Sequence, residues 1–231
     1  MLVERLTLWL ARTNAWIVAP SGPGGDCVLV DAPPEPSLLL DRLAALDLRP
    51  VAVFATHGHV DHVGGISTVV RRHDPHLPVH IHDHDLAMLL DPRGSGGLLA
   101  QHLGELDVAP PEVIAGLDDG EQVSGAGLTF TVLHTPGHTP GSVCLRLDAD
   151  GEAPRLFSGD HLFAGSIGRT DLPGGSFEQL MASMVDKVLP LSDEVAVLPG
   201  HGPVTTIGTE RATNPFLVDL RRVPLRSATR P

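Results

Sequence analysis

Several features that would identify common classes of protein are missing from this sequence. Tyrosine is absent, and only two of the 231 residues are cysteines, Cys27 and Cys144, both within apolar runs. Two cysteines are too few for a disulfide-stabilised fold or for a zinc site built from cysteine. No apolar run reaches the ~18 residues that a membrane-spanning helix needs. These absences exclude a disulfide scaffold, a cysteine-based zinc domain and a transmembrane protein.

Positive charge is also scarce. The formal net charge is −12 at pH 7, and Lys187 is the one lysine among the 16 basic residues. Because contacts to phosphates need a basic surface, this charge argues against a general nucleic-acid binder. The first five residues lack the charged head, apolar core and small-residue cleavage site of a secretory signal. We therefore predict a cytoplasmic protein that binds neither nucleic acid nor membranes.

Short apolar runs typical of strands alternate with helical patterns along the chain, which is long enough for one large α/β domain. The segment Pro92–Ala109 shows no clear pattern and is interpreted as a mobile flap. The arrangement favours a sandwich of two mixed sheets with helices outside. Strands are predicted at Leu2–Leu10, Ala15–Ala19, Cys27–Val30, Val51–Ala55, Val79–Ile81, Leu128–Leu133, Ser142–Leu147, Arg155–Phe157 and Glu194–Leu198. Helices are predicted at Pro36–Leu48, Val63–Arg72, Asp85–Leu90 and Ser176–Val188. Ser176, with Gln179 three residues later, predicts a capping box for the last helix, and the first two strands are predicted to form a hairpin.

Histidine is the residue that stands out, with 13 copies. The wholly apolar strand Val51–Ala55 leads directly into a loop that contains His57, His59, Asp61 and His62 and is followed by two glycines. Histidine and carboxylate are ordinary zinc ligands, and a glycine-rich turn lets several of them converge. Packing alone does not explain four such side chains within six positions. The loop is therefore a candidate metal site.

Three later strands end in a similar way, each with one potential ligand beside a glycine. His138 lies in the sequence TPGHTPGS, Asp160 ends the sequence FSGD, and His201 lies in the sequence LPGHGP. Small neighbours at a strand end allow a ligand to face a shared cleft instead of the core. One such motif would be weak evidence, but four in one chain predict a common metal centre.

At these motifs the chain resembles the metallo-β-lactamase-fold hydrolase superfamily, from Asn14 to about Leu217. The narrower resemblance is to the short bacterial glyoxalase II-like branch. It is carried by the sequence GDHLFAGSIGRTD from Gly159 and by the residues from Gly200 to Phe216. The resemblance implies an αββα sandwich of two mixed sheets over residues 1–217. Residues 218–231 are predicted to form a basic C-terminal tail.

The resemblance also implies which residues would hold two metal ions. His57, His59 and His138 would hold one ion. The ligands of the second ion would be Asp61, His62 and His201, and Asp160 would bridge the two. Zinc is the expected metal, and iron or manganese suits the same ligands.

The implied reaction is hydrolysis of a small-molecule acyl-thiol such as S-lactoylglutathione. Bound metal lowers the pKa of water from ~15.7 toward ~7, which supplies hydroxide at neutral pH. In this interpretation a bridging hydroxide attacks the thioester, and a thiolate leaves without a strong general acid. Asp61 is a candidate both for metal binding and for orienting the hydroxide.

Alternatives remain open at this point. A persulfide dioxygenase shares the implied fold and would use one iron held by His57, His138 and Asp160. A non-catalytic metal-binding module would be expected to lack some of the seven ligands, and all seven positions are filled. A β-lactamase would be expected to carry an export signal. The carrier thiol is also open, because the helical extension and tyrosine with which full-length glyoxalase II holds glutathione are missing here.

The other histidines and charged residues near these motifs are interpreted as structural residues and not as metal ligands. His161 follows a predicted ligand but is not assigned as one, and His134 is interpreted as a strand-end residue or, less favoured, a support for a ligand. Arg169 and Asp171 are predicted to form an internal pair that braces the metal-site loop, and Asp31 is assigned a structural part outside the site. Solvated or capping roles are favoured over a second metal site for five clustered histidines, His73, His76, His80, His82 and His84.

Overall fold

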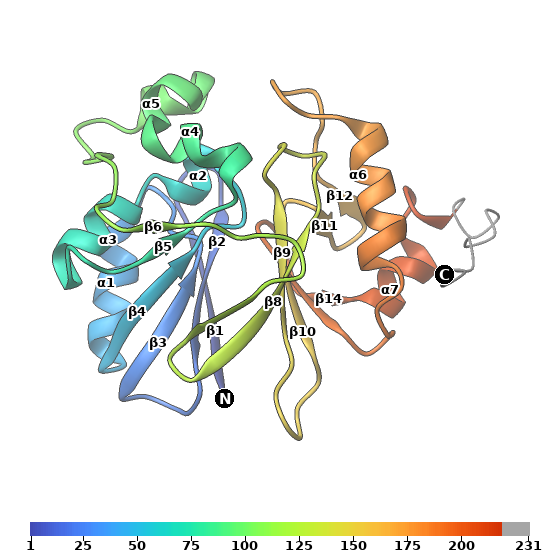
Figure 1. Cartoon of the computed structure of the whole chain (residues 1–231), viewed down its shortest axis with the longest axis horizontal. Helices are drawn as coiled ribbons and strands as arrows, with labels where there is room; N and C mark the ends of the chain where they lie inside the picture. The colour runs from blue at the N-terminus through green and yellow to red at the C-terminus, as the bar shows by residue number, and fades with distance from the viewer. Residues whose placement is uncertain (219–231) are drawn as a thin grey trace.

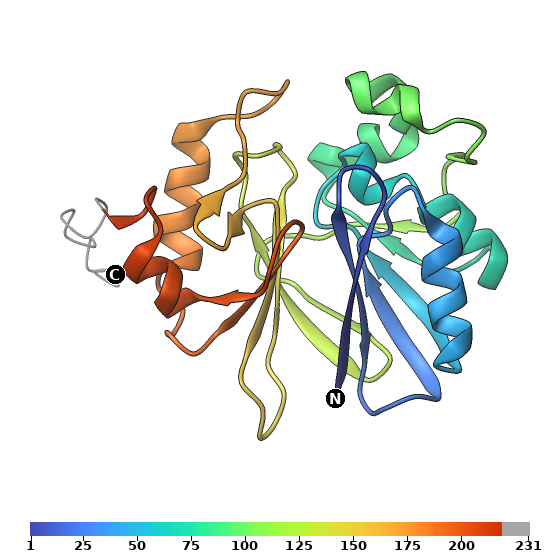
Figure 2. The same cartoon turned by 180° about the vertical axis from the view of Figure 1, so that it is seen from behind.

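The structure, a computed structural model, describes residues 1–218 and shows two mixed β-sheets packed face to face between outer helices (Figures 1 and 2). This is the predicted αββα sandwich. The first sheet has the strand order β1-β2-β3-β4-β5-β6, and β3 to β6 are parallel to one another. Its strands are β1 (Leu2–Leu8), β2 (Thr13–Ala19), β3 (Gly25–Val30), β4 (Leu48–Phe54), β5 (Val79–His80) and β6 (Ile114–Ala115).

The second sheet is mainly antiparallel, with one parallel pair between β10 and β13. Its strand order is β14-β13-β10-β9-β8-β7. Its strands are β7 (Gln122–Gly125), β8 (Leu128–His134), β9 (Val143–Leu147), β10 (Arg155–Gly159), β13 (Ala196–Pro199) and β14 (Thr205–Thr206). A separate small hairpin joins β11 (Leu162–Phe163) to β12 (Ser166–Ile167).

Helices cover the outer face of each sheet (Figure 1). Beside the first sheet are α1 (Pro36–Ala45), α2 (Val60–Val63), α3 (Ile66–His73), α4 (Leu86–Leu90) and α5 (Pro92–Ser95), and beside the second sheet are α6 (Phe177–Ser183) and α7 (Ile207–Thr213). Short 3-10 helices lie at Asp83–Asp85 and Gly97–His102, and a π-helical turn at Met184–Val188 extends α6. The Ser176 hydroxyl accepts from the Gln179 N–H at the start of α6, which confirms the predicted cap.

Three buried apolar clusters correspond to the three gaps between the four layers. One cluster joins the first sheet to α1 and α3 through residues such as Leu29, Leu39 and Val69. The middle cluster fills the space between the sheets, where Phe54 and Phe130 meet edge to face. The last cluster packs the second sheet against α6. Because both faces of the central strands are buried, β2 and the end of β3 are apolar almost without interruption.

The structure corrects several predicted boundaries. The helix predicted over Val63–Arg72 begins only at Ile66, as α3, because α2 ends at Val63 and Gly64 and Gly65 follow it. At Gly65 the chain passes so close to Pro33 that a Cβ would lie 2.1 Å from the Pro33 carbonyl oxygen. The helix α1 ends at Ala45, before the predicted Leu48, because the chain turns at Asp47 with φ 52° and then enters β4. The strands β6, β7 and β14 and the helix α7 were not predicted.

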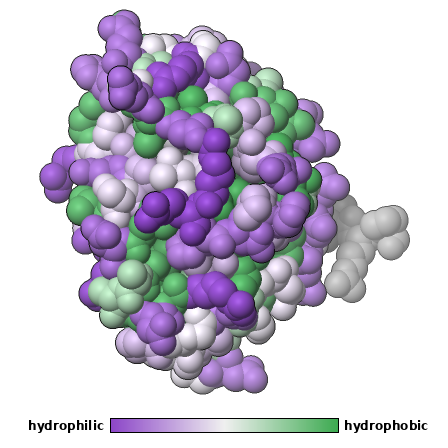
Figure 3. All heavy atoms as spheres, turned by 90° about the vertical axis from the view of Figure 1, so that its left-hand side faces the viewer, coloured by the Kyte–Doolittle hydropathy of each residue, from purple (hydrophilic) through white to green (hydrophobic). Residues whose placement is uncertain are grey.

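The predicted flap, Pro92–Ala109, begins with ordered turns. Asp91 caps α5 by accepting from the Gly94 N–H at 2.8 Å, and the 3-10 helix Gly97–His102 follows. None of the helices within residues 1–218 is both long and apolar enough to cross a membrane. The face shown in Figure 3 carries hydrophilic and hydrophobic residues side by side. The predicted tail, 218–231, lies outside the described residues except for its first residue.

Candidate metal centre

All seven predicted ligands lie in segments that follow the carboxyl ends of strands, at the upper edge of the sandwich in Figure 1, and two of them, Asp61 and His62, are in α2. The two sheets meet at this edge, so loops far apart in sequence come together there. The loop after β4 carries the first four of the seven, and β8, β10 and β13 are each followed by one more. In order along the chain they are His57, His59, Asp61, His62, His138, Asp160 and His201.

Three histidines form the first group. One ring nitrogen each of His57, His59 and His138 lies within 4.8 Å of the others. The distance between His59 Nδ1 and His138 Nε2 is 2.9 Å. His57 Nε2 is buried and has no hydrogen-bond partner in residues 1–218. A buried nitrogen without a partner is costly, so this lone pair fits a metal ligand better than a packing role.

A second group lies beside the first and includes a carboxylate. Asp61 Oδ2 is 3.3 Å from His201 Nε2 and 3.6 Å from His62 Nε2. These three side chains again place one ligand atom each within 4.8 Å of the others. His62 is fully buried, and its Nε2 also lacks a hydrogen-bond partner among the described residues.

Asp160 lies between the two groups and reaches both. Its Oδ1 is 3.3 Å from His62 Nε2, and its Oδ2 is 3.4 Å from His201 Nε2 and 3.5 Å from His138 Nε2. A carboxylate whose oxygens lie near nitrogens of both groups is suited to bridging two cations. The chain after Asp160 is held close by Gly168, where a Cβ would lie 1.8 Å from the Asp160 carbonyl oxygen.

Asp31 orients His62 from outside the group, a role that the sequence analysis did not assign. His62 Nδ1 donates to Asp31 Oδ2 at 2.8 Å, which leaves Nε2 free to face the other ligands. The same carboxylate accepts from the backbone N–H and the hydroxyl of Thr56, both at 2.8 Å. Asp31 ends β3, the parallel neighbour of the strand that leads to the loop, and has φ 61°. The place of Asp31 directly after a strand that neighbours β4 was the feature of the sequence that could have pointed to this role.

Other bonds fix the remaining ligands. His138 Nδ1 donates to the Arg169 carbonyl oxygen at 2.7 Å, which aims Nε2 at the centre. The Thr13 hydroxyl donates to Asp61 Oδ2 at 2.9 Å. Metal-binding histidines commonly donate their second N–H in this way, and such bonds fix the tautomer and ring orientation.

Asp85 is a second residue that the sequence analysis missed, since it was interpreted only as the start of a helix. Its buried carboxylate accepts from the N–H of Gly58 at 2.9 Å and of Gly141 at 2.7 Å, and from the Thr139 hydroxyl at 2.6 Å. These bonds join the loop of His57 and His59 to the loop of His138. A Cβ on Gly141 would lie 2.6 Å from Asp85 Cγ, so glycine is required there.

The electrostatics divide the histidines into two kinds. Burial, with His62 nearby, holds the pKa of His57 well below its ordinary value, so its ring is neutral and offers a lone pair. Burial acts in the same direction on His201, but the carboxylates of Asp160 and Asp61 outweigh it and raise its pKa to about 9. Burial would raise the pKa of Asp160, yet His62 and His201 hold it well below its ordinary value. The donor set therefore fits divalent cations.

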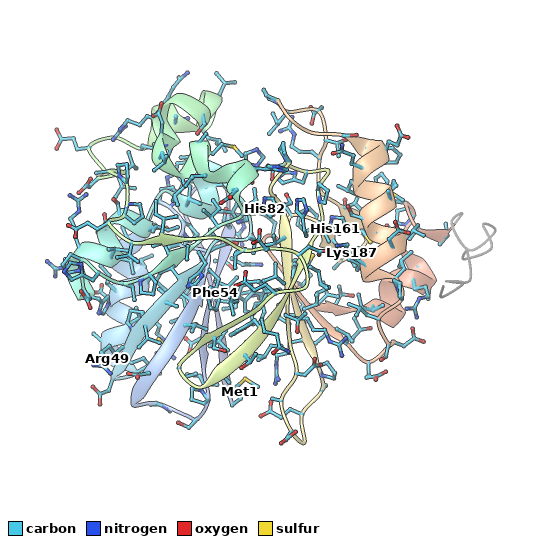
Figure 4. All side chains as sticks on the ribbon, in the orientation of Figure 1. Met1, Arg49, Phe54, His82, His161 and Lys187 are labelled. Carbon is cyan, nitrogen blue, oxygen red and sulfur yellow. The ribbon has the colours of Figure 1, made fainter. Side chains whose placement is uncertain are left out.

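Other histidines lie outside the two ligand groups, and Figure 4 labels two of them, His82 and His161. His82, His84 and His134 approach one another, and the rings of His82 and His134 stack at 3.9 Å. His134 Nε2 donates to the Pro140 carbonyl oxygen at 2.9 Å, so it supports the loop that carries His138. His161 is buried beside the centre but belongs to none of the convergent groups, and burial lowers its pKa to about 3.

The pair predicted from Arg169 and Asp171 forms, with Nε and Oδ1 2.7 Å apart, but it is not internal. The two side chains are 60% and 68% exposed. The backbone of Arg169, through its carbonyl oxygen, is what contacts the centre.

Comparison with known proteins gives the family. A family model described as the metallo-beta-lactamase superfamily matches residues 9–201. The chain belongs to the metallo-beta-lactamase superfamily. A relative within the superfamily is the hydroxyacylglutathione hydrolase GloC of Haemophilus influenzae, which is 36% identical over 91% of this chain and 90% of its own length.

Two solved structures of the superfamily are also similar to this chain. The BLEG-1 B3 metallo-beta-lactamase superposes with a TM-score of 0.82 at 36% identity and covers 94% of this chain and 99% of its own. TTHA1623, solved in a di-iron-bound form, has a TM-score of 0.78 at 40% identity over 93% of this chain and 100% of its own. The shared fold and the convergent histidines and aspartates indicate a metallo-hydrolase with divalent metal.

Proposed function

We propose that this protein is a cytoplasmic hydrolase that uses two divalent metal ions to cleave a thioester of a small acyl-thiol, such as S-lactoylglutathione. The position of Asp160 carries the proposal, because its two oxygens lie within 3.5 Å of nitrogens from both groups. A carboxylate shared between two ligand groups is suited to holding two ions close together. The name of the GloC relative supports a hydroxyacyl thioester as the substrate class.

In this proposal His57, His59 and His138 hold one ion, and Asp160 bridges to the second. The ligands of the second ion are Asp61, His62 and His201. Zinc is the metal that we propose, since histidine and carboxylate are its ordinary ligands. Iron fits the same donors, and one similar protein has a di-iron form.

Two cations at this place would polarise the thioester carbonyl and lower the pKa of a water toward ~7. The chain's own residues orient the reaction. Asp31 fixes the ring of His62, and Thr13 holds one oxygen of Asp61. Asp61 is the side chain that we assign to accept a hydrogen bond from the attacking water and so orient it. Because a thiolate leaves readily, the reaction needs no strong acid on the leaving-group side.

Metal content and turnover, measured on one preparation, test the proposal. Elemental analysis should find about two divalent ions per chain, as the two ligand groups require. The same sample should hydrolyse S-lactoylglutathione and should consume no oxygen with glutathione persulfide. One iron per chain with oxygen consumption would contradict the proposal and support a dioxygenase. Two ions with no thioester cleavage would leave the metal centre but remove the proposed substrate class.

A further inference from the structure

A cavity of about 420 Å³ opens beside His201, on the side of the metal centre where the first hairpin lies. Its walls come from β1, β2 and the turn between them, and from the loop that follows β13. Figure 2 shows the tip of this hairpin next to that loop. The cavity is within the size range of small-molecule sites. It therefore offers room for the part of a substrate that extends away from the metals.

The floor of the cavity is held in place by hydrogen bonds. Asn14 Nδ2 donates to the carbonyl oxygens of Pro199, at 2.9 Å, and Gly202, at 3.0 Å. The backbone N–H of Asn14 donates to the Gly200 carbonyl oxygen at 2.7 Å. Arg5 Nη1 also donates to the Gly202 carbonyl oxygen, at 3.0 Å. These bonds join the hairpin to the loop of His201, so the shape of the cavity is built into the fold.

The charge of the lining is opposite to that of the protein. Arg5 and Arg12 line the cavity, and no aspartate or glutamate does, in a chain with a net charge of −12. Several other arginines are paired with carboxylates, as Arg42 is with Glu4. The side chain of Arg12 has no hydrogen bond or ion pair within residues 1–218. Two arginines without a carboxylate partner therefore face one cavity beside the metal centre.

The backbone at Arg12 supports a role for its side chain. Arg12 has φ 56°, in the left-handed region that is unfavourable for residues with a Cβ and easy for glycine. A turn selected for local stability alone would favour glycine at this position. Conformations of this kind often occur where a side chain has a function.

We propose that Arg5 and Arg12 form a subsite for a carboxylate group on the thiol carrier of the substrate. Guanidinium groups bind carboxylates through paired N–H donors, which gives both affinity and orientation. Bound there, the carrier would be anchored beside His201 with its thioester toward the metals. This inference rests on the proposed thioester hydrolysis, and it names the class of thiol that the enzyme accepts as one that carries a carboxylate.

Substitution of Arg12 with glycine tests the subsite on the metal-loaded enzyme. Arg12→Gly removes the cation and suits the backbone at φ 56°, so the variant is expected to fold. Its KM for S-lactoylglutathione should rise about fivefold with kcat unchanged, the upper range for an accessible ion pair. Its KM for the lactoyl thioester of N-acetylcysteamine, which has no carboxylate, should not change. Arg72→Gln, in a separate cavity, is the matched control.

Failure of the subsite and failure of the proposed function would give different results. An equal change in KM for both thioesters, or no change for either, would overturn the subsite. Calorimetric titration of the metal-loaded enzyme with glutathione gives a readout that does not depend on turnover. If wild type cleaves neither thioester, the proposed function fails. Weaker glutathione binding in Arg12→Gly but not in Arg72→Gln would even then support the subsite, and unchanged binding would overturn it.

Discussion

Two clusters of histidines lie near each other in this fold, and their ring nitrogens are used differently. In the central cluster, made of the seven predicted ligands, His62 and His138 each donate one N–H outward and turn the other nitrogen inward. In the outer cluster, made of His82, His84 and His134, the ring nitrogens of His82 and His134 bond to the backbone.

The tautomer of His82 affects whether the outer cluster can bind a metal ion. His82 Nδ1 accepts from the His84 backbone N–H at 3.1 Å, so the neutral ring of His82 carries its proton on Nε2 and has no free lone pair. None of the ligand atoms that converge in the outer cluster belongs to a carboxylate. The central cluster has two, Asp61 and Asp160. The two carboxylates and the inward-facing nitrogens make the central cluster the better candidate for a metal site.

The largest effect is expected from the bridging carboxylate. Asp160→Asn removes the charge shared by both groups, so turnover should fall roughly a thousandfold, beyond the ten- to hundredfold typical of residues around ligands. Metal content should fall below that of the wild type. Elemental analysis and initial rates on the same sample measure both. His84→Asn, in the outer cluster, is the control, and an equal loss there would contradict the comparison.

Metal affinity of the central cluster should fall as the pH falls. The pKa of His201 is raised to about 9 by Asp160 and Asp61 against the effect of burial, so below pH 9 a metal must displace its proton. This proton lowers affinity about tenfold for each pH unit between 9 and 7. The pKa of His62, which Asp160 and Asp61 raise against the effect of burial, makes the fall steeper. Competition with a chelator at several pH values measures the slope. Constant affinity over this range would show that His201 is not a ligand.

A smaller effect is expected from the residue behind His62. Asp31→Asn keeps an oxygen that can accept from His62 Nδ1 but removes its charge, so metal affinity should fall about ten- to hundredfold. Asp26→Asn is a matched control on the same strand, because Asp26 pairs with Arg49 at the surface, where such pairs contribute little. Chelator competition on the two variants compares them. Equal affinities would show that Asp31 has only a structural part.

The smallest effect should come from the outer cluster itself. Replacement of His134 with glutamine keeps a donor for the Pro140 carbonyl oxygen and should leave the metal content of the protein unchanged. Titration of the wild type should likewise show no further site beyond the central ones. If the wild type bound a third ion per chain and His134→Gln lost it, the outer cluster would also be a metal site, which would contradict this comparison.

The ligands could be predicted from the sequence because each lies in a short, recognisable sequence pattern. A strand such as Val51–Ala55 ends, a glycine follows, and a histidine or aspartate lies beside it. The carboxyl ends of β4, β8, β10 and β13 lie at one edge of the sandwich, so the side chains that follow these strands come close to one another. The same locality explains the confirmed hairpin and the cap at Ser176.

The missed features depend on contacts between distant residues. Asp31 and His62 are 31 positions apart, and Asp85 and Gly141 are 56 apart. A lone aspartate has no local pattern that shows which histidine or N–H it will meet. Two-residue strands such as β14 are too short for alternation to be visible, and only pairing with β13 defines them.

The sequence by itself indicated the candidate ligands, their places at strand ends and the family to which the chain belongs, because those depend on residue type and on periodicity along the chain. The tertiary structure alone decided which nitrogen of each histidine faces inward, which aspartate lies behind which ligand, and that Arg5 and Arg12 share a cavity with His201. Such choices are made by hydrogen bonds across the sandwich. They exist only once distant strands have packed.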